Sequence, residues 1–173
     1  YGDNQDGNSP DECPDESGSS TIDRIGCLDS DGDGYSDQGD PFPSDDTQWA
    51  NRDGDSQDCG GDNQSGNNPD IFPDDPTQCK DTDGDGYGDN AAGSNGDAFK
   101  FDPTQWSDFD GDGFGDNNGT GSINGDICPT QAGNSANPIS RGCPDSDGDG
   151  FVDPEDAFPQ NPLQWSDRDG DGY

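Results

Sequence analysis

The sequence predicts an irregular fold with little regular secondary structure, arranged as an elongated tandem array of acidic, disulfide-stapled loops. Three observations predict it. The acidic sextet D-x-D-G-D-G recurs five times, hydrophobic residues are too few for a conventional core, and six cysteines are spaced among the repeats. Gly, Pro, Asn and Asp interrupt the chain at short intervals, and no window keeps an apolar period of 3.6 or 2.0 residues. Neither helices nor long strands are therefore expected.

The sextets begin at Asp29, Asp81, Asp108, Asp145 and Asp167, and each is followed by an aromatic residue. Carboxylates at positions 1, 3 and 5, a glycine at position 6 and a backbone carbonyl at position 7 form the pattern with which acidic loops bind calcium. The sextets therefore predict several Ca²⁺ ions, about one or two per repeat.

Positions 9 and 12 of such loops supply further oxygen ligands. In the loops that begin at Asp81 and Asp108, inserts displace the closing carboxylate to Asp97 and Asp126. The predicted metal ligands of the five sextets, with position 7 acting through its carbonyl, are Asp29, Asp31, Asp33, Tyr35, Asp37 and Asp40; Asp81, Asp83, Asp85, Tyr87, Asp89 and Asp97; Asp108, Asp110, Asp112, Phe114, Asp116 and Asp126; Asp145, Asp147, Asp149, Phe151, Asp153 and Asp156; and Asp167, Asp169 and Asp171.

A degenerate sixth copy of the sextet runs from Asn51 to Ser56. Asn51 replaces the first Asp and Ser56 replaces the glycine, so this copy predicts a weaker site. Its candidate ligands are Asp53 and Asp55, with Asp58 and Asp62 as further candidates.

The charge balance indicates that cations are required for folding. Asp and Glu number 41 against 6 Lys and Arg, His is absent, and the net charge is -35. Two carboxylates about 4 Å apart repel by roughly 4 kcal/mol at an effective dielectric near 20. Leu, Ile, Val and Phe together number 17 of 173 residues, too few to offset this repulsion and the entropy of ordering the chain. The same charge excludes nucleic acid as a partner and disfavours membranes, and no apolar run is long enough to insert into one.

A second phrase follows the loops. It reads D-P-F-P-S-D-D-T-Q-W from Asp40 to Trp49 and recurs from Asp97 to Trp106 and from Asp156 to Trp165. The copy from Asp70 to Cys79 has cysteine in the place of tryptophan, and the copies that begin at Asp11 and Asp126 have cysteine in the place of phenylalanine. The alignment predicts that each repeat is closed either by a Phe–Trp contact or by a disulfide: Phe42–Trp49, Phe99–Trp106 and Phe158–Trp165, or Cys13–Cys27, Cys59–Cys79 and Cys128–Cys143.

The two phrases together divide residues 1–173 into one continuous array of about six repeats. The units lie near 1–28, 29–50, 51–80, 81–107, 108–144 and 145–166, and a partial unit covers 167–173. The aromatic rings are expected to be small local cores. Stacking of Trp49, Trp106 and Trp165 on sugars is an open alternative.

The cysteines favour disulfides over zinc sites, because there is no C-x-x-C pair and no His. Disulfides and calcium loops of modest affinity both suit an oxidising, calcium-rich environment. The sequence therefore predicts an extracellular protein, secreted or at the cell surface. The sequons at Asn63 and Asn118 lie in Gly/Asn-rich inserts and are weak candidates for glycosylation.

The chain resembles the thrombospondin type 3 repeat family, and especially its bacterial variety. The family pattern D-x-D-x-D-G-x-x-D-x-x-D is met from Asp29 to Asp40 and from Asp145 to Asp156, and the phrase P-T-Q-W is shared. The resemblance implies a rod of irregular chain wrapped around calcium ions, with sequential disulfides. Helix-loop-helix sensors and dockerins fit less well because their helices are missing, and the nonapeptide repeat of calcium β-rolls is absent.

The two ends continue each other in sequence. The last loop reads D-R-D-G-D-G-Y and ends at Tyr173. The chain begins with Y-G-D-N, the same four residues that follow the Asp81 sextet from Tyr87 onward. Asp3 and Asp11 are therefore candidate ligands that complete a loop of the Asp167 type. We expect either a longer tandem protein or separate protomers that join head to tail. The expected partners are the protein itself or adjacent repeats, with glycans or other matrix components as further candidates.

The sequence favours an extracellular calcium-binding structural protein that forms a stiff rod, stalk or fibril. A calcium-dependent adhesion module is one alternative, and a calcium-buffering or mineral-nucleating polyanion is another. An enzyme is not expected: there is no His, no Cys/His pair and no nucleophile motif, and the acidic pairs are better explained as ligands.

Overall fold

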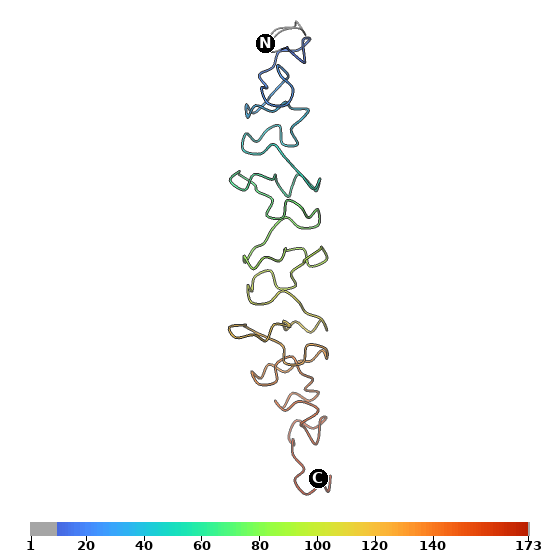
Figure 1. The fold of residues 1–173 in the computed structure, drawn as a ribbon. Coiled ribbons are helices and arrows are strands. Elements are labelled where there is room, and N and C mark those ends of the chain that lie inside the picture. The colour runs from blue at the N-terminus through green and yellow to red at the C-terminus, as the bar shows by residue number, and fades with distance from the viewer. Residues whose placement is uncertain (1–9, 173) are drawn as a thin grey trace. The chain divides into compact units, whose positions relative to one another are not determined.

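A computed structural model describes residues 10–172, and in this part of the chain there is no helix. Isolated parallel bridges join Gly61 to Pro69, Gly88 to Gly96 and Gly115 to Gly125. Figure 1 shows turns and bends without a coiled ribbon or an arrow. The predicted irregular fold is confirmed for these residues. No helix that could span a membrane occurs among residues 10–172.

The chain divides into two compact units, each with its own disulfides. The first is Tyr1–Lys80 with Ala92–Asn95, and it contains Cys13–Cys27 and Cys59–Cys79. The second is Asp81–Ala91 with Gly96–Tyr173, and it contains Cys128–Cys143.

The interior of both units is polar. Among the described residues, the buried hydrophobic side chains are Cys27, Cys143 and Val152. Several Asp residues and Gln48, Gln78 and Gln105 are buried instead. Polar groups can be buried at low cost only where they have partners, so the fold depends on how these side chains are satisfied.

The buried glutamine of the second phrase, which precedes its Trp or Cys, binds the insert that follows it. Gln48 Nε2 donates to the carbonyl oxygens of Asn63 and Asn68 at 3.1 and 3.2 Å, and its Oε1 accepts from Asn63 N at 3.0 Å. Gln78 Nε2 donates to Ser94 O at 2.9 Å. The inserts belong to no helix or sheet, so their backbone carbonyls need other donors. The glutamine side chains provide these hydrogen bonds.

One backbone hydrogen bond closes each loop in the same way. The backbone N–H of the aspartate that begins the second phrase donates to the carbonyl of loop position 8, as in Asp40 N to Ser36 O at 2.9 Å and Asp156 N to Val152 O at 3.0 Å. Where an insert intervenes, the bridge restores this bond: Asp97 N donates to Gly88 O at 2.8 Å, and Asp126 N to Gly115 O at 2.7 Å. The inserts therefore loop out without displacing the closing aspartate.

Candidate metal centre

Each acidic loop is folded by its own carboxylates. In the first loop, Asp29 Oδ1 accepts from Gly32 N at 2.7 Å and Asp29 Oδ2 accepts from Gly34 N at 3.2 Å. Asp33 Oδ1 accepts from Tyr35 N at 2.8 Å. Gly32 and Gly34 have φ of 88° and 103°, which a residue with a Cβ rarely adopts, so both positions require glycine.

The same hydrogen bonds recur in the other sextets. The carboxylates of Asp81, Asp108, Asp145 and Asp167 each accept from two glycine amides, at positions 4 and 6 of their loops. Asp85, Asp112 and Asp149 accept from the amide of the aromatic residue at position 7. Both carboxylate oxygens of position 1 therefore accept hydrogen bonds from the loop backbone. In the first loop, positions 3 and 5 each accept with one oxygen only.

In the loops that begin at Asp29, Asp81, Asp108 and Asp145, the remaining oxygens of positions 3 and 5 are buried without a donor, except Asp112 Oδ2, which accepts from Gly133 N at 2.9 Å. A buried carboxylate oxygen without a partner is strongly destabilised, and a cation bound by these atoms would remove that cost. In addition to these, Oδ2 of the closing Asp126 is unpartnered, and this residue is fully buried. The unpartnered oxygens are Oδ2 of Asp31, Asp33, Asp53, Asp83, Asp85, Asp110, Asp126, Asp147 and Asp149, and Oδ1 of Asp55.

The aspartates that begin the second phrase and close the loops are buried. Asp40, Asp70, Asp97, Asp126 and Asp156 are between 0% and 9% exposed. In each, Oδ1 accepts from the amide two residues further on, at 2.6 to 2.8 Å. This bond fixes the carboxylate and leaves Oδ2 available to face the loop.

The closing carboxylates face those of their own loops. Burial, and then repulsion by the loop carboxylates, raise the pKa of Asp40 to about 6. Burial followed by the same kind of repulsion raises the pKa of Asp70, Asp97 and Asp126. These shifts mark places where negative charge is crowded and desolvated, as at a cation site without its cation.

One ligand atom from each member of several trios lies within 4.8 Å of the other two. This spacing allows one ion to contact all three carboxylates. Asp55 also groups with Cys59 and Cys79, but both sulfurs belong to a disulfide and cannot act as thiolate ligands. The all-carboxylate trios among the described residues include Asp29, Asp31 and Asp33; Asp53, Asp55 and Asp70; Asp81, Asp83 and Asp85; and Asp108, Asp110 and Asp112.

Asp70 was missed by the sequence reasoning, which looked for the ligands of the degenerate copy at fixed distances from Asn51. The structure places Asp70 with Asp53 and Asp55. Asp62, not Asp58, takes the place of position 9, because Asp62 N donates to Ala50 O at 2.9 Å as Asp37 N does to Leu28 O at 2.8 Å. The missed signal was the phrase D-I-F-P, in which Asp70 aligns with the closing aspartates.

The aspartate at position 9 accepts hydrogen bonds from the start of its own loop. Asp37 accepts from both the amide and the hydroxyl of Ser30, at 2.7 and 2.6 Å. Thr82 donates in the same way to Asp89, and Ser146 to Asp153. In the remaining loop Asp116 accepts from Ser107 Oγ and Phe109 N. These carboxylates keep free lone pairs, so they can contact an ion while holding the loop closed.

The predicted partners of the tryptophans were wrong. Each Trp stacks on the aromatic residue at position 7 of the preceding loop, not on the Phe of its own phrase. The ring centroids of Tyr35 and Trp49 are 6.0 Å apart, with planes 4° from parallel. The Tyr87–Trp106 and Phe151–Trp165 stacks have centroid distances of 5.0 and 5.2 Å. Position 7 therefore places its ring on the tryptophan that follows its loop.

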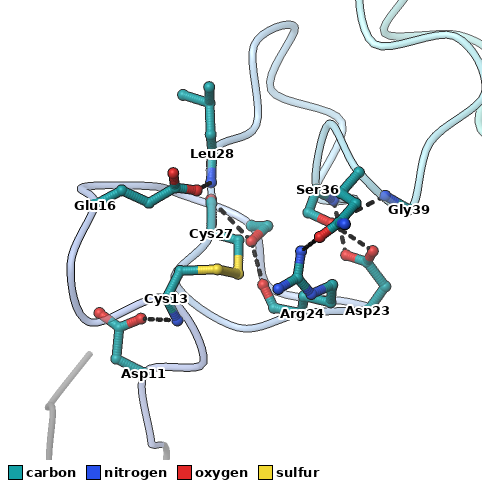
Figure 2. Close-up of a disulfide and its surroundings, with 11 residues drawn as sticks. Asp11, Cys13, Glu16, Asp23, Arg24, Cys27, Leu28, Ser36 and Gly39 are labelled. Atoms are coloured by element: carbon teal, nitrogen blue, oxygen red, sulfur yellow. Dashed lines mark hydrogen bonds between the residues drawn. A yellow bond between two sulfur atoms is a disulfide. The ribbon is translucent and has the colours of Figure 1, made fainter.

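The disulfides join the pairs that the aligned phrases predict. They are Cys13–Cys27, Cys59–Cys79 and Cys128–Cys143, with Cα–Cα distances of 5.0, 4.9 and 5.0 Å. Figure 2 shows the first, beside which Asp11 Oδ1 accepts from Cys13 N at 2.8 Å as the other closing aspartates do. Such crosslinks suit an oxidising environment.

A second acidic contact lies near this disulfide. Asp23 accepts from both the amide and the hydroxyl of Ser36, each at 2.7 Å (Figure 2). Ser36 carries the carbonyl that binds Asp40 N. Asp23 therefore anchors the closing turn of the first loop from the preceding repeat.

The amide nitrogens of both sequon asparagines are engaged. Asn63 Nδ2 donates to Thr47 O at 2.8 Å, and Asn118 Nδ2 donates to Asp126 O. A glycan on either nitrogen would replace one of its two hydrogens and leave one to donate. Among the other predicted ligands, Asp167 lies in an exposed loop, and Asp3 lies outside the described residues.

Comparison with protein-family models and with curated proteins finds no match for the chain. The trios offer carboxylate oxygens, and the chain has no His. Oxygen-only sites select hard cations such as Ca²⁺ and Mg²⁺ over zinc or copper.

Proposed function

We propose that this chain is an extracellular calcium-binding structural protein of the thrombospondin type 3 repeat kind, in which Ca²⁺ ions hold successive loops closed and make an irregular chain stiff. The main support is Asp126, a fully buried carboxylate whose Oδ2 has no donor and faces the Asp108 loop. Burial of the ionised form of such a group is costly unless a cation neutralises it.

Calcium is favoured over magnesium because each loop offers more oxygens than Mg²⁺ accepts from protein. Asp108, Asp110 and Asp112 lie together. Burial, and then the carboxylates of Asp112, Asp110 and Asp116, raise the pKa of Asp126, which comes from a later chain segment. Ca²⁺ takes six to eight oxygen ligands in flexible geometry, whereas Mg²⁺ keeps several waters and requires an octahedral site. The chain would hold these carboxylates close together through its hydrogen bonds, and the bound ion would neutralise their charge.

We propose further that the array continues head to tail, through adjacent repeats or a second protomer. Gln48, Gln78 and Gln105 are at most 1% exposed because each binds an insert. The equivalent Gln164 is exposed, and the neighbouring Leu163 is 83% exposed. An insert from a further repeat would cover Gln164 as the inserts cover the other three glutamines. The proposed location is the cell surface or the extracellular matrix.

The test is a calcium titration of chelator-stripped, disulfide-intact protein. Hydrodynamic radius and near-ultraviolet circular dichroism report folding, and equilibrium dialysis counts the ions. We expect saturable binding of about one or two ions per loop together with a transition to a fixed shape, and a much smaller response to Mg²⁺. Weak, unsaturable binding without a change of shape would instead identify a polyanionic calcium buffer.

A further inference from the structure

The degenerate loop of residues 51–56 differs from the others in charge while it keeps their backbone fold. Asn51 Oδ1 accepts from Gly54 N at 2.8 Å, just as Asp29 Oδ1 accepts from Gly32 N at 2.7 Å. The second group of Asn51 is an NH₂, which donates to Asp55 O at 3.2 Å. The first turn of the loop is therefore preserved, but position 1 contributes no negative charge.

A guanidinium further reduces the charge at this loop. Arg52 Nε lies 3.9 Å from Asp62 Oδ2, and Arg52 Nη1 lies 2.8 Å from Asp74 Oδ1. Asp62 occupies the place of position 9, so the cation of Arg52 lies beside one of the loop's own carboxylates. The Asp29 loop gathers five carboxylates, whereas this loop gathers four and one guanidinium.

The acidic trio is nevertheless formed. Asp53 Oδ2 and Asp55 Oδ1 are buried without donors, and the closing Asp70 is 2% exposed. One oxygen from each lies within 4.8 Å of the other two. The loop can therefore bind an ion, at a lower affinity, because calcium affinity in acidic loops follows the charge of the ligand set.

Other bonds hold this repeat closed independently of an ion. The Cys59–Cys79 disulfide links the insert to the end of the phrase. Gln48 binds the insert at Asn63 and Asn68. Loss of the ion would therefore change the charge at this repeat more than its fold.

We propose that the site of Asp53, Asp55 and Asp70 is a low-affinity calcium site, which releases its ion before the complete loops that begin at Asp29, Asp81, Asp108 and Asp145 as free calcium falls. This inference rests on the proposed function. The loops then differ in calcium affinity. The full loops stay saturated, while the degenerate loop exchanges its ion near the ambient calcium concentration. The local negative charge of this repeat then varies with calcium while its crosslinked fold persists.

The amide of the glycine at position 4 is a reporter in every loop, because it binds the side chain of position 1. Calcium titration followed by ¹H–¹⁵N NMR on the whole chain compares Gly54 with Gly32, Gly84 and Gly111. We expect the Gly54 signal to shift at about tenfold higher free calcium than the other three. A Gly54 transition at the same or lower calcium would overturn the inference.

Three variants separate charge from folding. Asn51→Asp should move the Gly54 transition to lower calcium, and the matched change Asp29→Asn should move the Gly32 transition to higher calcium. Arg52→Gln removes an exposed cation without removing a ligand, so it should also move the Gly54 transition to lower calcium. If Asn51→Asp and Arg52→Gln leave the Gly54 midpoint unchanged, the inference is wrong. If no loop glycine responds to calcium, the proposed function itself is wrong.

Discussion

The side-chain amide of Gln105 pairs with the backbone of Asn117 in both directions. Gln105 Nε2 donates to Asn117 O at 2.8 Å, and Gln105 Oε1 accepts from Asn117 N at 3.0 Å. Nε2 also donates to Ile123 O at 2.9 Å. A Cβ on Gly115 would lie 2.0 Å from Oε1, so a glycine is needed there for the amide to fit. One fully buried side chain thus joins the second phrase to the next loop and its insert.

Substitution of this amide tests its contribution to stability. Gln105→Glu keeps the shape but replaces two donated hydrogen bonds with a buried negative oxygen that faces two carbonyls. We expect a loss of about 2–4 kcal/mol in the free energy of unfolding, measured by urea denaturation in saturating calcium. Gln164→Glu is the matched control, because Gln164 is exposed, and it should change stability by less than about 0.5 kcal/mol. Equal losses in the two variants would contradict this role.

The closing aspartates and the cysteine pairs follow from alignment of the repeated phrases. Each phrase begins with an aspartate or carries a cysteine at a fixed place, so Asp97, Asp126 and Cys128–Cys143 could be predicted despite inserts of different length. Asp70 could not be found by counting from Asn51, because the insert carrying Cys59 shifts position 8 to Gly61, whose carbonyl accepts from Asp70 N at 2.9 Å.

The glutamine contacts and the ring partners had no local signal in the sequence. Gln105 reaches Ile123, which is 18 residues away, and the contact depends on the path of the insert rather than on a period. The tryptophans were assigned to the phenylalanines because both belong to one phrase. The chain instead brings each Trp over position 7 of the loop before it, as in Tyr87 and Trp106.

The Tyr87–Trp106 stack should contribute to stability more than an unstacked ring at the same loop position. Tyr87→Ala removes a ring from a stack whose planes are 2° apart, and we expect a loss of about 1–2 kcal/mol. Phe114 also occupies position 7, but its phrase is closed by Cys128–Cys143, and no ring stack involving it occurs among residues 10–172. Phe114→Ala should therefore cost less. Urea denaturation in calcium compares the two, and a greater loss for Phe114→Ala would be inconsistent with the stack's role.

Asp126→Asn should have opposite effects with and without calcium. In calcium it removes one charged ligand, so the number of bound ions should fall by about one per chain and the unfolding temperature should fall. In chelator it removes a buried charge that faces Asp112 and Asp110, so the unfolding temperature should rise.

Asp46→Asn is the control for this change, since Asp46 is exposed and the net charge changes equally. It should leave the ion count unchanged. Calorimetry in both conditions, with equilibrium dialysis, distinguishes the cases. A lower unfolding temperature for Asp126→Asn in chelator as well would show that its carboxylate stabilises the fold without an ion.

The raised pKa values predict how pH acts on the ion-free protein. Burial, and then repulsion by neighbouring carboxylates, raise the pKa of Asp40 and of Asp55 from 3.8 to about 6. The folded chain therefore binds these protons more tightly than the unfolded chain does. Their contribution to stability is complete below pH 3.8 and is lost as the pH rises through about 6. In chelator, the protein should be more compact and more stable at pH 5 than at pH 7.5.

Calcium should reverse this dependence. The ion binds the ionised carboxylates, so protons compete with it, and its apparent affinity should fall as the pH drops through about 6, the pKa of Asp40 and Asp55. Stability in saturating calcium should therefore increase from pH 5 to pH 7.5. Asp40→Asn should flatten the ion-free dependence at this pH, whereas Asp46→Asn should preserve it. Thermal unfolding at both pH values, with and without calcium, measures the effect, and the same direction of change in both conditions would contradict cation binding by these carboxylates.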